Sequence, residues 1–383
     1  MRAIVTTIPL ALLAACGFNG TDRNEEGGEP VAAVPAEPEG ADSMASRDPA
    51  PGETVRAESE DAGDRPLMQL QVVLERLGFG PGVVDGRMGM STENALAGFQ
   101  EANDLPITGE ADEATRAALA RWSNIPATRI VTIPEEWGRI AFAPVPDDPA
   151  EQARMSALGY ESLDEKLAER FHTTVEVLRE LNPGGGPAAE RDAAAASSPV
   201  TAAPIFRAGQ TIRVPNVGAD HIVPRAIEDD GWRRTLASLG VGSEQPKAAR
   251  IVVDKSDGWL KAYDEAGALV AMFTVTTGSR NDPLPLGEWG VNGVAHNPPF
   301  AYNPELFWDV SDSEDKQQLP PGPNGPVGVV WIDLTKEHYG IHGTNAPETI
   351  GRAQSHGCVR LTNWDAARLA EMVSGSTRVL FQA

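Results

Sequence analysis

Residues 355–360 read Ser-His-Gly-Cys-Val-Arg and contain Cys358, one of two cysteines in the 383-residue chain. A glycine stands directly before this cysteine, and His342 lies 16 residues upstream of it. A thiol needs a nearby base or cation to ionise at neutral pH, and His342 and His356 are the two candidate bases. Gly357 allows a tight backbone turn whose N–H groups can face a developing oxyanion. The pattern indicates a cysteine nucleophile.

Two other interpretations of Cys358 are open on these residues alone. A lone cysteine is usually a small buried apolar residue. A zinc site is also possible in principle, although such sites usually need a third or fourth ligand. The surrounding sequence distinguishes these alternatives.

Further motifs precede the cysteine in a fixed order. They are Thr277-Gly278, PLGEW at 285–289, NPPF at 297–300, PPGPNGPVG at 320–328 and YGIHGT at 339–344. In order and spacing they resemble the catalytic domain of the L,D-transpeptidases, the YkuD-type family. The resemblance runs from about residue 250 to the C-terminus. Val359 stands where the family often has Ile or Leu, which conserves volume.

The resemblance implies roles for individual residues. Cys358 matches the nucleophile that forms a thioester, and His342 matches the general base that returns the proton to the leaving amine. The backbone carbonyl of Gly343 matches the group that orients the imidazole, and the N–H of Gly357 is an expected oxyanion donor. Three positions are expected to contact substrate, namely Ser355, His356 and Arg360. For Arg360 a structural salt bridge is an open alternative, and for Ser355 a local hydrogen bond. No metal or cofactor is implied.

The implied activity is peptidoglycan L,D-transpeptidation. A donor tetrapeptide would be cleaved between the L-centre of a diamino acid and a terminal D-residue. The acyl group would then pass to an amine, forming a 3→3 crosslink or attaching a protein to the cell wall. One alternative is a hydrolase of the same fold, an L,D-endopeptidase or carboxypeptidase, which would pass the acyl group to water. Another is a non-catalytic lipoprotein that binds the wall.

The first residues are typical of an exported protein. A basic residue precedes an apolar run that is too short for a membrane span and is typical of a signal peptide. The run ends Leu-Ala-Ala-Cys-Gly at 13–17, which resembles the bacterial lipoprotein cleavage box. Residues 1–16 are therefore expected to be a lipoprotein signal peptide with Cys16 lipidated; an ordinary secretory signal is the alternative. Gly17, rather than Asp, favours the outer membrane, so the expected location is the periplasmic side of the cell envelope.

Residues 17–65 contain 13 acidic and four basic side chains and almost no large apolar residues. Such a segment cannot bury a core and is expected to be a disordered acidic tether. The whole chain carries a formal net charge of −23, which argues against nucleic acid because its phosphates would repel the protein. The expected partners are peptidoglycan and, through the lipid, a bilayer.

Residues 66–123 are expected to form three short helices. Apolar residues recur at helical spacing over 67–77, and Gly78 supplies a stop. Two further helices follow the turn signals Asp85-Gly86 and Thr108-Gly109. The pattern resembles the small three-helix peptidoglycan-binding domain.

Residues 159–216 predict two short amphipathic helices, split near residues 172–174, and a strand that ends at Pro215. This pattern resembles a LysM module, which binds glycans rich in N-acetylglucosamine. The usual Gly-Asp-Thr opening is absent, and residues 184–201 are a low-complexity insert. Glycan binding and a purely structural spacer are both open.

From residue 251 the apolar period changes to two, which is typical of strands. Strands are expected at 251–253, 259–263, 270–276, 327–334 and 379–381. Residues 264–267 predict a hairpin turn, and residues 363–373 predict a helix with Asn363 as its N-cap. Residues 249–383 are expected to be the mainly β, sandwich-like catalytic domain, and the whole chain to be a multidomain α+β protein.

Overall fold

The computed structural model describes residues 65–186, 205–218, 221–223, 226–306, 315–355 and 357–383. The predicted signal peptide with Cys16, nearly all of the predicted tether and most of the low-complexity insert lie outside these residues. No helix in the described part of the chain is long and apolar enough to cross a membrane. The described residues all belong to one unit, which spans 40–383.

The N-terminal helical segment consists of α2 (Pro66–Arg76), α3 (Met90–Ala102), α4 (Glu113–Leu119) and the short η1 (Ala120–Trp122). Gly78 has φ +95°, a conformation that suits glycine and ends the first helix. Asp112 caps α4 by accepting a hydrogen bond from Thr115 N at 2.9 Å. The predicted helices and turns of this segment are therefore present.

Two buried glutamines hold the two turns of this segment in the same way. Gln71 Oε1 accepts from the backbone N–H groups of Asp85 and Gly86, and Gln71 Nε2 donates to Thr92 Oγ1. Gln100 makes the equivalent set of bonds to the second turn and to Thr115, with Thr108 N and Gly109 N as donors. The segment is thus built on an internal repeat in which each side-chain amide satisfies a turn that would otherwise leave buried N–H groups unpaired.

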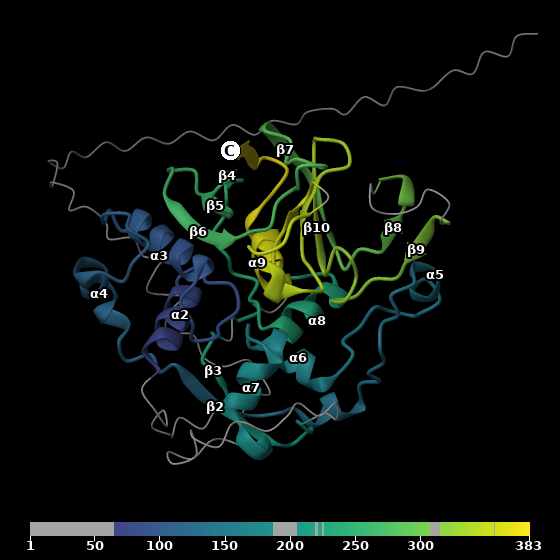
Figure 1. The fold of residues 1–383 in the computed structure, drawn as a ribbon, viewed down its shortest axis with the longest axis horizontal. Helices are drawn as coiled ribbons and strands as arrows, with labels where there is room; N and C mark the ends of the chain where they lie inside the picture. The colour runs from purple at the N-terminus through teal and green to yellow at the C-terminus, as the bar shows by residue number, and fades with distance from the viewer. Residues whose placement is uncertain (1–64, 187–204, 219–220, 224–225, 307–314, 356) are drawn as a thin grey trace, which may run out of the picture. The chain divides into compact units, whose positions relative to one another are not determined.

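Strand β1 (Phe79–Gly80) builds the helical segment into the C-terminal sheet. It pairs in parallel with β6 (Leu269–Thr274), with Phe79 opposite Met272. Helix α3 also packs on β6 (Figure 1). A Cβ atom on Gly98 of α3 would lie 2.5 Å from Met272 Sδ, so any larger residue there would require the Met272 side chain to shift.

The middle of the chain forms a unit of two strands and two main helices. β2 (Thr128–Thr132) pairs antiparallel with β3 (Thr211–Pro215), and α6 (Leu163–Arg170) and α7 (Val175–Leu181) lie between them in sequence. Both helices and β3 agree with the predicted elements, but β2 lies outside the predicted boundaries of 159–216. The short elements are η2 (Glu135–Arg139), α5 (Pro149–Gln152) and η3 (Pro183–Gly185).

Within the described residues, nine strands form one sheet in the order β1-β6-β5-β4-β13-β7-β10-β11-β12. The remaining strands of this sheet are β4 (Arg250–Asp254), β5 (Trp259–Tyr263), β7 (Gly287–His296), β10 (Val330–Leu334), β11 (Gly340–His342), β12 (Val359–Arg360) and β13 (Arg378–Gln382). β8 (Phe300–Tyr302) and β9 (Gln317–Leu319) form a separate antiparallel pair. The helices of this region are α8 (Asp230–Leu239) and α9 (Asn363–Met372), with the 3-10 turns η4 (Pro304–Leu306) and η5 (Pro347–Thr349).

The strands expected from the two-residue period are present as β4, β5, β6, β10 and β13, and the predicted turn joins β5 to β6. The sequence prediction missed β7, which is ten residues long. It contains three glycines, and most of its residues are partly or fully exposed rather than alternating. A strand without alternating burial leaves no two-residue period to detect.

Helix α9 packs against β10 and β11 (Figure 1) and completes the core with the fully buried Trp364. The expectation that Asn363 caps this helix is wrong. Thr362 is the N-cap, because its Oγ1 accepts from Asp365 N at 3.2 Å. The Asn363 side chain is fully buried and is bonded instead to groups outside the helix.

Candidate active site

Two neighbouring strands bring the cysteine motif and His342 together. β11 and β12 pair in parallel, with His342 opposite Arg360. Cys358 directly precedes β12 and therefore lies beside the start of β11. On the other side of β11, Trp331 of β10 is opposite His342. Adjacent strands thus unite residues that are 16 positions apart in sequence.

Cys358 is only partly buried. Its Sγ lies 3.8 Å from His338 O, and the backbone N–H of Gly340 also faces the sulfur. Ser355 is buried, and its hydroxyl donates to Cys358 O at 2.6 Å. This bond fixes the backbone on which the thiol is carried and satisfies the local hydrogen bond that was one alternative for Ser355.

Gly357 has φ +100°, and a Cβ atom there would lie 2.7 Å from a ring carbon of Tyr339. Both the backbone conformation and the close contact exclude an ordinary side chain. Glycine before the nucleophile therefore serves two purposes. It permits the turn, and it lets the Tyr339 ring pack against the motif.

His342 is buried, and its Nδ1 lies 2.7 Å from Gly343 O. A carbonyl oxygen only accepts, so Nδ1 must carry the proton and Nε2 is left as the basic atom. The ring stacks on Trp331, with centroids 5.5 Å apart and planes inclined by 22°. The imidazole is thus held in one tautomer by Gly343 and in one plane by Trp331.

Electrostatics keep this pair uncharged. Burial, reinforced by the Arg360 cation, lowers the pKa of His342 to about 3, while the Gly343 carbonyl opposes the shift. Burial also raises the pKa of Cys358, although the Gly340 N–H and Arg360 work in the opposite direction. A neutral thiol beside a neutral imidazole is the ground state that these shifts favour near pH 7.

Arg360 is the cation of the site. Its backbone is bonded on both sides to Thr276, whose N–H donates to Arg360 O at 3.0 Å and whose O accepts from Arg360 N at 2.9 Å. Its Nε is buried and has no hydrogen-bond partner within the described residues. No carboxylate within the described part of the chain forms an ion pair with its guanidinium, which leaves an Arg donor available for an acidic group of a ligand.

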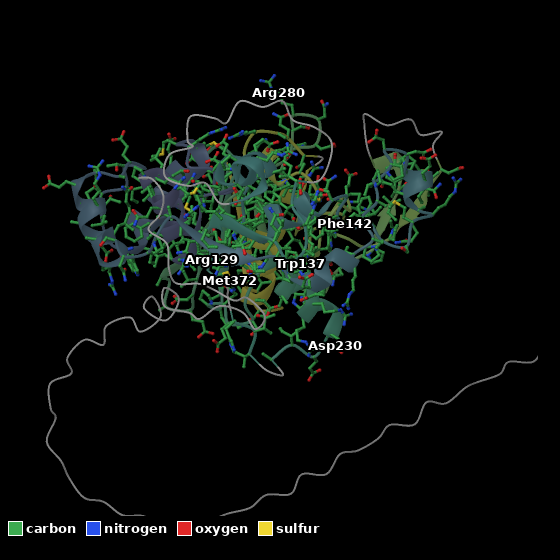
Figure 2. All side chains as sticks on the ribbon, turned by 90° about the horizontal axis from the view of Figure 1, so that it is seen from below. Arg129, Trp137, Phe142, Asp230, Arg280 and Met372 are labelled. Atoms are coloured by element: carbon green, nitrogen blue, oxygen red, sulfur yellow. The ribbon has the colours of Figure 1, made fainter. Side chains whose placement is uncertain are left out.

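The chain that follows Thr276 lines the motif. Ser355 N donates to Thr277 O, and Ser279 N donates to Ser355 O. Arg280 continues this loop; it is exposed, and its side chain stands clear of its neighbours at the rim of the view in Figure 2. The loop therefore lies against the backbone of the motif at Ser355, and Arg280 extends from it into solvent.

The structure gathers most of the residues singled out from sequence. The gathered residues are Ser355, Gly357, Cys358, Arg360, His342 and Gly343. His356 and Cys16 lie outside the described residues. Sequence reasoning missed Tyr339 and Trp331 as neighbours of the site, because only strand pairing and the glycine contacts bring their rings to it. Within the described residues, no group of three or more His, Cys, Asp or Glu side chains is placed to hold a metal.

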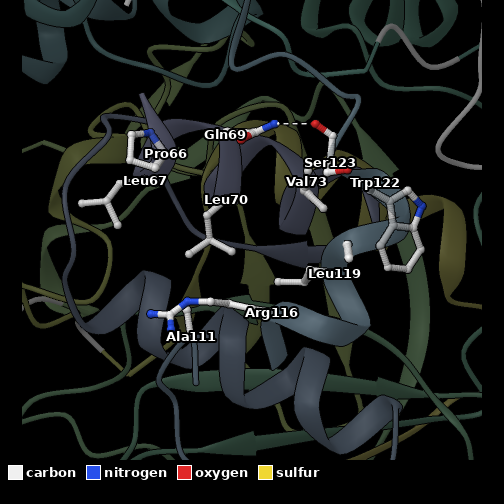
Figure 3. Close-up of a pocket in the computed structure, with 11 residues that line it drawn as sticks. Pro66, Leu67, Gln69, Leu70, Val73, Ala111, Arg116, Leu119, Trp122 and Ser123 are labelled. Carbon is white, nitrogen blue, oxygen red and sulfur yellow. Dashed lines mark hydrogen bonds between the residues drawn. The ribbon is translucent and has the colours of Figure 1, made fainter. Parts of the chain in front are cut away.

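A separate pocket of about 340 Å³ lies in the helical segment (Figure 3). Leu70 and Val73 of α2 face Leu119 and Trp122 across it, and Arg116 stands at its side. Gln69 spans one end, where its Nε2 donates to Ser123 O at 3.0 Å. An apolar hollow with one cation and one amide is a suitable shape for a small ligand.

Two family models match the chain. Residues 248–380 match the L,D-transpeptidase catalytic domain named YkuD, and residues 65–119 match the family described as "Putative peptidoglycan binding domain". Among solved structures, L,D-transpeptidase 3 from Mycobacterium tuberculosis shares 17% identity with a TM-score of 0.29 over 35% of this chain. The chain spans 60% of the length of that protein.

Curated relatives extend the match. The "Putative L,D-transpeptidase YkuD" of Bacillus licheniformis is 29% identical over 217 residues, which are 56% of this chain and 90% of the relative. The "Putative L,D-transpeptidase in ATP synthase subunits region ORF 5" of Fuscovulum blasticum is 38% identical over 148 residues, which are 39% of this chain and 73% of the relative. With motif, site geometry and relatives in agreement, this chain belongs to the L,D-transpeptidase family and also carries a peptidoglycan-binding domain.

Proposed function

We propose that the protein is a peptidoglycan L,D-transpeptidase that uses Cys358 as its nucleophile and His342 as its base. The observation that carries the proposal is the placement of both residues at the paired strands β11 and β12, with Nδ1 of His342 held by Gly343 O. This arrangement leaves Nε2 as the proton acceptor. Nucleophile, base and orienting group are the three parts that covalent acyl transfer requires.

In the proposed reaction, Cys358 Sγ attacks the carbonyl carbon that joins the L-centre of a diamino acid to a terminal D-residue. His342 Nε2 takes the thiol proton and delivers it to the nitrogen of the leaving D-residue as the C–N bond breaks. The acyl group remains on sulfur as a thioester. An acceptor amine then attacks this carbonyl and gives its proton to His342. The C–S bond breaks, and the thiol recovers the proton.

Other residues of the motif support the same steps. The N–H groups of Gly357 and Cys358 are the proposed donors to the oxyanion. Arg360 is proposed to bind a carboxylate of the peptide stem, since its Nε has no hydrogen-bond partner within the described residues. His356 is proposed as a substrate contact. Ser355 supports the site through its bond to Cys358 O.

The pKa shifts predict an unusual pH profile for acylation of Cys358. Because the pKa of His342 is lowered to about 3 and that of Cys358 is raised, the reactive neutral pair persists through mildly acidic pH. Imipenem is a carbapenem that has been observed in complex with another L,D-transpeptidase, and it serves here as the acyl donor to Cys358. We expect the rate at which it forms an adduct, followed by mass spectrometry, to be nearly constant between about pH 5 and pH 8. An ordinary histidine base would instead lose activity about tenfold per pH unit below about 6.5. Such a decline would contradict this assignment of charge states.

The fate of the acyl group distinguishes the proposal from its rivals. Purified protein is incubated with a tetrapeptide-stem muropeptide, and the products are identified by mass spectrometry. A crosslinked dimer with loss of the D-residue supports transpeptidation. A shortened stem without a dimer indicates the hydrolase of the same fold, and no product with an intact fold indicates a wall-binding protein without activity. Attachment of a protein to the wall is tested in the same way, with a protein-derived amine as acceptor.

We propose that residues 66–123 hold the catalytic domain, residues 249–383, on insoluble peptidoglycan. The pocket between Leu70 and Trp122 is the candidate contact surface. A binding module raises the local concentration of substrate without touching the reacting atoms. Loss of sedimentation with peptidoglycan on replacing Leu70 with Glu would support this role, and unchanged sedimentation of a folded variant would exclude the pocket. The segment 159–216 is proposed to be LysM-like.

Peptidoglycan-acting domains suggest a location in the cell envelope. We propose that Cys16 is lipidated after cleavage of residues 1–15 and that the acidic tether extends the enzyme from an outer membrane. Cys16→Ser is expected to release the protein from the membrane fraction or to block its maturation, because stable anchoring needs more than one acyl chain and a lipidated N-terminal cysteine carries several. Detergent partitioning of fractionated cells measures this. A soluble wild-type protein with residue 16 unmodified or removed would show an ordinary secretory signal.

A further inference from the structure

The Asn363 side chain connects several segments of the chain next to Gly343, whose carbonyl orients the candidate base His342. It is fully buried, and its Oδ1 accepts from Val329 N at 3.2 Å. Its Nδ2 donates to Pro323 O at 3.1 Å and to Glu169 Oε1 at 2.7 Å. Since Thr362 caps α9, the Asn363 amide is free to serve these contacts instead.

The Asn363 amide lies in close contact with Gly343, the residue whose carbonyl orients His342. A Cβ atom placed on Gly343 would lie 2.2 Å from Asn363 Oδ1 and 3.5 Å from Asn363 Cα. A Cβ atom on Gly328 would lie 1.9 Å from the same oxygen. The backbone of Gly343 therefore has no space to move toward α9 while Asn363 keeps its position. The carbonyl of Gly343 is the acceptor for His342 Nδ1.

Glu169 holds the Nδ2 end of the Asn363 amide by accepting its hydrogen bond. It comes from α6 and is 194 residues from Asn363 in sequence. Its second oxygen, Oε2, is bonded to the Tyr160 hydroxyl, and the side chain is buried. Tyr160 and Glu169 both belong to the LysM-like segment. Burial raises the pKa of Glu169 to about 7, and a carboxyl group removed from water needs such bonds to offset its lost hydration.

We propose that Glu169 is a positioning residue of the transferase, which anchors Asn363 and thereby holds the Gly343 carbonyl against His342. The inference rests on the proposed role of His342 as the base. The inference gives the segment 159–216 a part in catalysis that is independent of glycan binding. Through Glu169 and Asn363, this segment supports the position of the His342 imidazole. The bond from Glu169 to Asn363 crosses from this segment to the catalytic domain.

The side-chain chemistry of position 169 makes this testable. In Glu169→Gln, the amide oxygen can accept from Asn363 and the amide N–H can donate to the Tyr160 oxygen, so both contacts survive. In Glu169→Met, the volume is similar but neither bond remains. A displacement near 1 Å at a catalytic group can cost about 100-fold in rate, so loss of one support is expected to cost at least about tenfold.

The matched control is Glu165→Met on the same helix. Glu165 also reaches the catalytic domain, where its Oε1 accepts from Asn324 Nδ2 at 2.7 Å, but it has no bond to Asn363. Full-length chains are compared for the saturating rate of Cys358 acylation by imipenem, for the half-saturating concentration and for the melting midpoint.

We expect Glu169→Met to lower the saturating rate at least about tenfold with little change in half-saturation, whereas Glu169→Gln and Glu165→Met stay within about threefold of wild type. Combining Glu169→Met with Asn363→Ala should add little to Asn363→Ala alone, because both act through one contact. A folded Glu169→Met that acylates as fast as Glu165→Met, or additive effects in the cycle, would overturn the inference.

If Glu169→Met does not fold, Glu169→Asp decides the question. Its carboxyl group is one methylene shorter and withdraws from Asn363, so the same loss of rate is expected and a wild-type rate contradicts the inference. Failure of Cys358 as the nucleophile has a different signature. In that case wild-type protein itself forms no adduct on Cys358.

Discussion

Cys358→Ala should abolish turnover of muropeptides and formation of any imipenem adduct while leaving the protein folded. The proposed reaction has no route without a nucleophile, since acyl transfer proceeds through a bond to Sγ. The structural change is small. Cys358 is partly exposed, so removing one sulfur atom should cost no more than about 1 kcal/mol of stability, the scale of one buried methylene. Product analysis and intact-protein mass spectrometry measure the effect.

The second cysteine supplies the control for this result. The sequence holds only Cys16 besides Cys358, so purified Cys16→Ser should still form the full adduct. Product from a folded Cys358→Ala variant, or an adduct mapped to a serine, would end the thiol hypothesis.

Glu75→Met should destabilise the protein by about 3–5 kcal/mol, the cost of breaking a buried ion pair by removing one of its members. Glu75 of α2 is 3% exposed, and its Oε1 lies 2.8 Å from Arg368 Nη1 of α9 and 3.2 Å from His172 Nδ1. Burial works to raise the pKa of Glu75, but Arg368 and His172 outweigh it and hold the pKa below its ordinary value. The carboxylate is therefore charged, and its removal takes one buried partner from both Arg368 and His172.

An exposed ion pair between the N-terminal helical segment and α7 provides the comparison. Arg87 and Glu180 lie 3.7 Å apart with side chains 70% and 57% exposed, so Glu180→Met should cost about 0–1 kcal/mol. Urea denaturation of full-length variants measures both. The double variant Glu75→Met with Arg368→Met should recover much of the loss, because apolar groups then replace both charges of the buried pair. Equal small effects of Glu75→Met and Glu180→Met would mean that the buried pair contributes nothing to joining the segments.

This expectation changes how the helical segment must be tested. The pairing of β1 with β6 and the bond between Glu75 and Arg368 make residues 66–123 part of the architecture around the sheet. Their deletion would expose a strand edge and apolar surface and would remove Glu75 from Arg368. Point substitutions in the pocket of this segment therefore separate binding from folding better than a deletion does.

The sequence by itself predicted the features that depend on neighbours in the chain. Gly357 next to Cys358 predicted the turn, which has φ +100°. Period-two runs predicted β4, β5 and β6, and the turn signal at 264–267 predicted the hairpin between β5 and β6. These features are local because backbone conformation and the alternation of side chains are properties of short stretches.

Only the tertiary structure determined which charged and polar side chains are buried together. His172 lies two residues beyond the end of α6 and is buried against Glu75, 97 residues away in sequence. Asn363 was expected to cap its own helix, yet it is bonded to Glu169, 194 residues away. Burial of a polar group is tolerated only where partners satisfy it. Here those partners come from segments that meet only when the chain folds, so no local pattern could reveal them.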